Sequence, residues 1–188
     1  MKSRFKVLGH PAHPTLVVFP LAFYPLAAIA LIVYLLLLAF GWTNGDHVLN
    51  FDVGFWWRAS FWMLLIGLLG NLAAALPGLV DWLNIPNDAP AKDKATWHLI
   101  IALLLAGITV MSLLLLNLGE PPARIIFPND LFILVGAGLA IFNGFILATY
   151  QGWLGGELVY RHGIGVERTD DIDPIAVTPG SEGMRENI

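Results

Sequence analysis

Four apolar stretches dominate this sequence, and each is long enough to cross a lipid bilayer, which requires about 20 residues. They run from about residue 14 to 40, 55 to 83, 99 to 118 and 131 to 158. Only 13% of the residues are charged, against about 25% in a typical soluble domain. A chain of 188 residues cannot bury this much apolar surface in a core surrounded by water. We therefore predict an all-α integral membrane protein, with four helices packed as an antiparallel bundle because their connections are short.

Polar residues next to the apolar stretches indicate where two of the helices begin and where the transmembrane domain ends. Asp130 is a suitable N-cap for the fourth helix, and Asp88 with Pro90 suits the start of the third. Residues 1–168 form the predicted transmembrane domain. Residues 169–188 are polar and include three aspartates and two prolines, so we expect a mobile cytoplasmic tail.

The distribution of positive charge predicts the orientation of the bundle. An even number of spans places both termini on one side of the membrane. That side carries eight basic residues, Lys2, Arg4, Lys6, Lys92, Lys94, Arg161, Arg168 and Arg185, and the other side carries Arg58 and Arg124. Because basic residues accumulate on the cytoplasmic side, both termini are expected in the cytoplasm of a bacterial cell, with the protein in its inner membrane.

Composition also excludes several classes of function. The chain has no cysteine, so it has no disulfides, thiolate metal sites, cysteine nucleophiles or cysteine-ligated iron–sulfur clusters. Its net charge is −4, which argues against a nucleic-acid partner. No charged residue lies at the middle of a span, and no inverted repeat is evident, so a transporter is disfavoured.

Histidines are sorted by this topology to one end of the bundle. His10 and His13 precede the first span, His98 begins the third and His162 ends the fourth, whereas His47 lies on the opposite side. Asp81 ends the second span on the same side as the four histidines. Every helix therefore brings an imidazole or a carboxylate to the cytoplasmic end, where ionisable groups at membrane depth tend to be functional. The alternative is that each histidine is an independent interfacial residue bonded to water or to a carbonyl.

Two further patterns lie in the fourth span. Small residues recur every four positions, at Gly136, Ala140, Gly144, Ala148, Gly152 and Gly156, with Gly155 widening this small-residue ridge. Such ridges let helices approach closely in lipid, and the cytoplasmic end could instead leave a slot for a flat cofactor. Glu157 lies four residues before Arg161, so an ion pair is at least as good an explanation for Glu157 as metal ligation.

Several motifs resemble one bacterial membrane family, called domain of unknown function 2231. They are GHPAHP at residues 9–14, LPGLVDW at residues 76–82, WH at residues 97–98 and GWLGGELVYRHG at residues 152–163. The resemblance covers about residues 7 to 168. It implies that His10, His13, Asp81, His98, Glu157 and His162 belong to the family pattern, without saying what they bind. Some relatives resemble fusions to a Rieske-type iron–sulfur domain, which would imply a redox setting and, for this chain, a separate redox partner protein.

Three functions fit these observations. The first is a haem b protein that transfers electrons, with His98 and His162 as axial ligands, His10 or His13 as substitutes, and Lys94 and Arg161 near the propionates. The second is a zinc, iron or copper site formed by His10, His13, Asp81, His98 and His162, with Glu157 a weaker candidate. The third is a non-catalytic membrane subunit with interfacial histidines. Whether the protein is an enzyme stays open, and so does assembly into a homo-oligomer.

Overall fold

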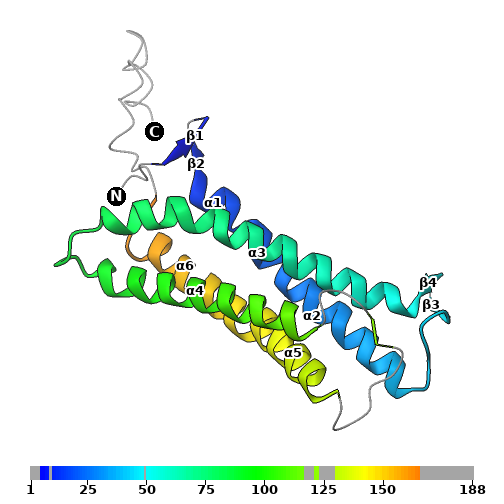
Figure 1. Ribbon diagram of the computed structural model, residues 1–188. Coiled ribbons are helices and arrows are strands. Elements are labelled where there is room, and N and C mark those ends of the chain that lie inside the picture. Colours follow the sequence, from blue (N-terminus) through cyan, green and yellow to red (C-terminus); the bar gives the residue numbers. More distant parts are fainter. Residues whose placement is uncertain (1–4, 9, 49, 117–120, 123–129, 166–188) are drawn as a thin grey trace, which may run out of the picture.

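The computed structural model describes residues 5–8, 10–48, 50–116, 121–122 and 130–165. Within these residues, four helical stretches are long and apolar enough to span a membrane: Ala12–Ala39, Val53–Leu83, Ala91–Leu115 and Leu131–Tyr160. Successive spans run in opposite directions (Figure 1). The prediction of an all-α, four-helix membrane protein is therefore confirmed. The polar tail expected at residues 169–188 lies outside the described residues.

Two of the four spans depart from a regular α-helix at one point. The first consists of α1 (Ala12–Leu16) and α2 (Val18–Ala39), which are separated at Val17. The second and third are the continuous helices α3 (Val53–Leu83) and α4 (Ala91–Leu115). The fourth consists of α5 (Leu131–Phe142), the π-helical segment η2 (Asn143–Leu147) and α6 (Ala148–Tyr160).

The helix starts follow the sequence in part. Pro90 occupies the N-cap of α4, where its fixed φ suits a helix start. Asp130 occupies the N-cap of α5, but its side chain makes no capping hydrogen bond. Asp52 does cap its helix, because its carboxylate accepts a hydrogen bond from the Phe55 N–H at the start of α3.

A short antiparallel pair of strands flanks each end of the first span. At one end, β1 (Lys6–Val7) pairs with β2 (His10–Pro11), and at the other, β3 (His47–Val48) pairs with β4 (Phe51–Asp52). The loop before β3 is fixed by Asp46, which accepts hydrogen bonds from the Thr43 backbone N–H and hydroxyl. These bonds hold the pKa of Asp46 below its usual range. The start of α1, the α3–α4 connection and the end of α6 all lie at the end opposite β3 and β4 (Figure 1).

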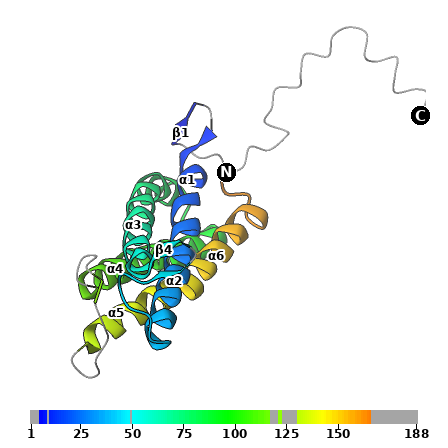
Figure 2. The same ribbon diagram turned by 90° about the vertical axis from the view of Figure 1, so that its right-hand side faces the viewer.

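The spans form a closed ring of contacts. Helix α2 packs against α3 on one side and against the fourth span on the other, and α4 also contacts both (Figure 2). The buried centre includes Tyr24, Leu31, Tyr34 and Leu64, all of which are inaccessible to solvent. Large apolar side chains cover the outer faces of all four spans. This arrangement suits a bundle whose outer surface contacts lipid.

Buried amides connect neighbouring spans, as expected for isolated polar residues in a membrane. The Asn71 amide on α3 donates to the Ala102 carbonyl of α4 at 3.0 Å. The Asn143 amide on η2 donates to the Thr109 hydroxyl of α4 at 2.8 Å. Each amide thus links two helices through a hydrogen bond that no water molecule in lipid could replace.

The small-residue ridge of the fourth span packs tightly along its first half. A Cβ atom added at Gly136 would lie 2.7 Å from Leu115 Cβ, and one added at Gly144 would lie 2.6 Å from the Tyr24 carbonyl oxygen. In a regular α-helix, a row of every fourth residue drifts about 40° around the axis at each step. The wider turn of η2 rotates the helix by fewer degrees per residue and so counteracts this drift. Towards the end of α6 the ridge opens, and a Cβ at Gly156 would meet only Tyr160, at 3.9 Å.

Candidate functional site

A cavity of about 330 Å³ lies between the four spans at the end where α1 begins and α6 ends. We call it the histidine cavity. Its walls are mainly apolar, and its polar lining side chains include His13, Asp81, His98 and Gln151. The apolar walls include Pro14, Val17, Leu21, Leu99, Ala102, Leu105, Ala148 and Leu158, and glycines line it at Gly78, Gly152, Gly155 and Gly156. Its volume falls in the range typical of small-molecule and cofactor sites.

His13 enters the cavity from α1 and is fixed by the backbone of α3. Its Nδ1–H donates to the Ala74 carbonyl oxygen at 2.8 Å. Because a carbonyl can only accept, this bond requires a proton on Nδ1, so Nε2 is the ring nitrogen that could bind a ligand. The contact depends on Gly78, since a Cβ there would lie 2.8 Å from His13 Nδ1. The His13 ring is therefore oriented by its neighbours, as the rings of metal-binding histidines commonly are.

His98 enters from α4, on the opposite side of the cavity. Its Nε2 lies 3.1 Å from the Gln151 side-chain amide of α6, and its Nδ1 is buried without a hydrogen-bond partner. A Cβ at Gly155 would lie 3.2 Å from His98 Cε1, so an alanine there would require the ring to shift by a few tenths of an ångström. A buried ring nitrogen without a partner is costly. His98 thus has an unsatisfied polar atom that a bound ligand, or a turn of the ring, could satisfy.

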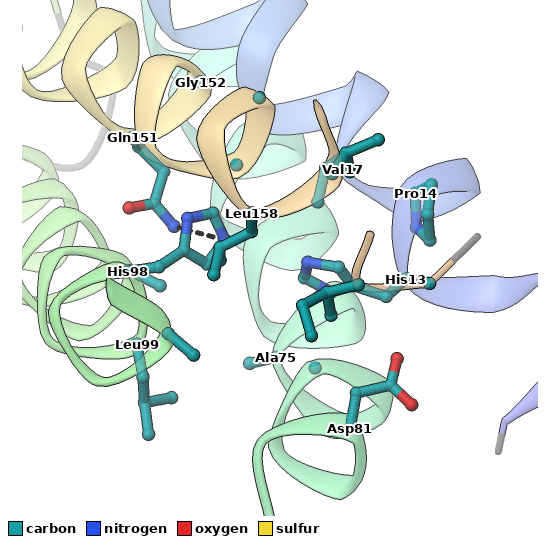
Figure 3. A pocket seen from close by; sticks show the side chains of 18 of the residues that line it. His13, Pro14, Val17, Ala75, Asp81, His98, Leu99, Gln151, Gly152 and Leu158 are labelled. Carbon is teal, nitrogen blue, oxygen red and sulfur yellow. Dashed lines mark hydrogen bonds between the residues drawn. The ribbon is translucent and has the colours of Figure 1, made fainter. Parts of the chain in front are cut away.

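The two imidazoles face each other across the cavity. Their centroids are 5.9 Å apart and their planes are inclined by 76°, in an edge-to-face arrangement. Figure 3 shows the His13 and His98 rings turned towards one another, with Gln151 beyond His98 and Asp81 on the α3 side of the cavity. An ion bonded to one nitrogen of each imidazole at about 2 Å would hold the ring centroids roughly 6 Å apart. The observed centroid distance is close to that value, and together with the 76° inclination it is also that of an ordinary edge-to-face contact between two rings.

Other candidate ligands from the sequence lie elsewhere. His10 is exposed in β2, and His162 follows α6 in a turn; neither lines the histidine cavity. Glu157 also lies outside it and pairs with Lys94 and Arg161, which agrees with the ion-pair interpretation of this residue. The convergence expected of four imidazoles therefore extends to two of them, with Asp81 lining the same cavity.

The positions of these side chains bear on whether the protein alone could supply all the ligands of a metal ion. Among the described residues, no group of three or more histidine, aspartate or glutamate side chains is placed to hold one metal ion together. His10 and His162 lie beyond the regular helices, so the spacing of the spans does not aim them inward. The two imidazoles that do meet belong to α1 and α4, which bring them together across the bundle.

Gln151 is a site residue that the sequence analysis did not single out. The structure places its side-chain amide 3.1 Å from His98 Nε2. The sequence did contain a signal for this role. Gln151 and Gly155 are four residues apart, so they lie on the same face of the helix, and that face contacts His98. The Ala74 carbonyl could not have been found this way, because every residue carries a backbone carbonyl.

Comparison with known families places these features in context. A family described as "Predicted membrane protein (DUF2231)" matches residues 9–168. The chain belongs to the DUF2231 family. The DUF2231 match covers all four spans and every residue that lines the histidine cavity. No curated protein and no solved structure matches this chain.

Proposed function

We propose that this protein binds haem b in the histidine cavity, with the iron held between His13 and His98, and that it transfers electrons at the membrane. The observation that carries the proposal is the pair of facing imidazoles with centroids 5.9 Å apart. His13 takes the place that the sequence had given to His162, because His162 does not line the cavity. Two imidazoles from different helices are a common way to hold a b-type haem in a membrane bundle.

The surroundings of the two rings support this donor set. His13 Nδ1–H is tied to the Ala74 carbonyl at 2.8 Å, which fixes the ring and leaves Nε2 as its donor atom. His98 has one ring nitrogen bonded to Gln151 and one that is buried without a partner. If the His98 nitrogen nearer the iron is Nε2, Gln151 would have to release it, and the amide side chain is long enough to turn away.

The lining of the cavity supports an apolar ligand. Gly152, Gly155 and Gly156 line it from α6, and a Cβ added at Gly156 would meet only Tyr160 of its own helix. Leucine, valine and proline side chains provide most of the remaining wall. A porphyrin would contact such walls over both faces, and burial of its apolar surface would contribute most of the binding free energy.

Electron transfer is the chemistry that bound haem would supply, through the ferric and ferrous states of its iron. The protein would hold the iron by two imidazoles in an apolar cavity, leaving no open position for a substrate. The cavity lies near one surface of the membrane, within reach of a separate redox partner protein. We place this surface on the cytoplasmic side of a bacterial cell membrane, on the basis of the distribution of basic residues.

A single non-haem metal ion is the second candidate, and the observation that favours it is Asp81 in the wall of the same cavity. Two imidazoles and one carboxylate are a known donor set for zinc, iron and copper. The described side chains are not arranged around one such ion, so this candidate requires Asp81 to move.

The absorption spectrum of the purified protein, combined with elemental analysis, distinguishes these candidates. We expect a Soret band, an α band that sharpens on reduction, and one iron per chain. Stoichiometric metal without a Soret band would replace the haem proposal by the non-haem one. Neither haem nor metal, after growth with both supplied, would contradict both.

The orientation has its own test. Reporter fusions after Asn44 and after Gly180 should localise to opposite sides of the membrane, with the Gly180 fusion in the cytoplasm. The expectation rests on four spans and on the excess of basic residues at the terminal side. A cytoplasmic signal from the Asn44 fusion would contradict the proposed orientation.

A further inference from the structure

A second pocket lies along the last two turns of α6, next to the histidine cavity. It has a volume of about 290 Å³ and is lined by Trp153, Gly156, Glu157, Tyr160 and Arg161. It combines charged and aromatic side chains at the end of a membrane span, where headgroups meet the hydrocarbon core. We call it the headgroup pocket.

Glu157 organises the charges around this pocket. Its side chain is only 8% exposed, and its two oxygens pair with Lys94 at 3.5 Å and Arg161 at 3.3 Å. The carboxylate therefore holds two cations from α4 and from the end of α6 close together. Two cations and one carboxylate leave a net charge of +1, which an anion near the pocket would neutralise.

An apolar stripe continues from the pocket into the span. Ile146, Tyr150 and Trp153 are all exposed and follow one another at i, i+4 and i+7. The Tyr150 and Trp153 rings are stacked with their centroids 5.8 Å apart, and Lys94 Nζ lies 5.6 Å from the Trp153 ring centroid. A cation beside the apolar stripe matches a phospholipid, because the cation would contact the headgroup and the stripe would contact an acyl chain. A free anion would contact only the cation.

We propose that the headgroup pocket binds one anionic phospholipid, with its phosphate beside Lys94 and Arg161 and an acyl chain along Trp153 and Tyr150. A lipid with a net negative headgroup, such as phosphatidylglycerol, neutralises the excess charge, and zwitterionic phosphatidylcholine does not. This site is separate from the proposed haem site and does not depend on it, although Gly156 and Tyr160 border both cavities.

Native mass spectrometry of the detergent-purified full chain tests the proposal by titration with phosphatidylglycerol and with phosphatidylcholine of the same acyl chains. The wild type should bind one phosphatidylglycerol more tightly than phosphatidylcholine. The double variant Lys94→Gln/Arg161→Gln should weaken phosphatidylglycerol binding about 25-fold, at about fivefold for each cation, and leave phosphatidylcholine binding unchanged. Arg58→Gln is the matched control, because it removes an ion-paired arginine at the other end of the bundle and should change neither affinity.

Three outcomes would overturn the proposal. The double variant could bind phosphatidylglycerol as well as the wild type does, or the wild type could bind both lipids equally. Millimolar inorganic phosphate could displace the lipid, which would indicate a site for free anions. The haem content of the same samples provides a further arm: loss of haem from the double variant with unchanged lipid binding would assign the two cations to the propionates of the haem.

Discussion

Replacement of His13 or of His98 by alanine should each abolish stoichiometric haem binding. Each variant removes one of the two imidazoles that we propose hold the iron, whose ring centroids lie 5.9 Å apart. Loss of a residue that only orients a metal ligand commonly lowers affinity by about 10- to 100-fold. Loss of a ligand itself should therefore lower haem affinity by at least about 100-fold. The measurement is the height of the Soret band per chain in the purified variants, which should fall to near background.

Two matched variants make this result specific. His47→Ala lies at the opposite end of the bundle, and His162→Ala lies outside the cavity, so both should keep wild-type haem content. The variant His13→Gly separates loss of a ligand from loss of the fold. If this protein is folded, free imidazole added after purification should replace the missing side chain and restore the Soret band. Haem loss in His162→Ala together with retention in His13→Ala would return the ligand role to His162 and contradict the assignment.

The second large effect is expected at Gly144, where the fourth span touches α2. In Gly144→Ala, the new Cβ would lie 2.6 Å from the Tyr24 carbonyl oxygen and 2.8 Å from Ala28 Cβ. The first of these atoms is backbone, so the helices themselves would have to separate. We expect a loss of about 2–3 kcal/mol in the free energy of unfolding, measured by denaturation in mixed micelles.

Gly138→Ala is the control for this substitution. Gly138 lies on the same span with no atom within 4 Å of an added Cβ. Alanine favours helix over glycine by roughly 0.5–1 kcal/mol, so this variant should be as stable as the wild type or slightly more stable. Equal stability of the two variants would show that the fourth span does not pack against α2 as described.

Much of the fold could be predicted because the bilayer restricts what an apolar chain can do. A run of about 20 apolar residues has to be helical in lipid, so the four stretches predict four helices and their order. The break at Val17 and the π-helical turn at Asn143–Leu147 were not predicted. They depend on contacts between helices, such as the bond from Asn143 to Thr109, rather than on local sequence.

The candidate site could be predicted only to the level of one end of the bundle. Topology alone brings His10, His13, His98 and His162 to that end. It does not show which of them point inward, because these helices are apolar on all sides and carry little periodic signal of their rotation. His13 and His98 face the cavity because Gly78 and Gly155 leave space for their rings. That dependence of a histidine on a glycine in another helix is visible only in three dimensions.

The spin state of the oxidised iron, measured by electron paramagnetic resonance on the purified wild-type protein, tests the central claim most directly. Iron held between the His13 and His98 imidazoles has two nitrogen axial ligands, so the account predicts a low-spin ferric haem signal at one equivalent per chain. A high-spin ferric haem signal would mean that one of the two axial positions lacks a histidine. That result, or a metal signal without any porphyrin, would contradict the assignment of His13 and His98 as a haem-binding pair.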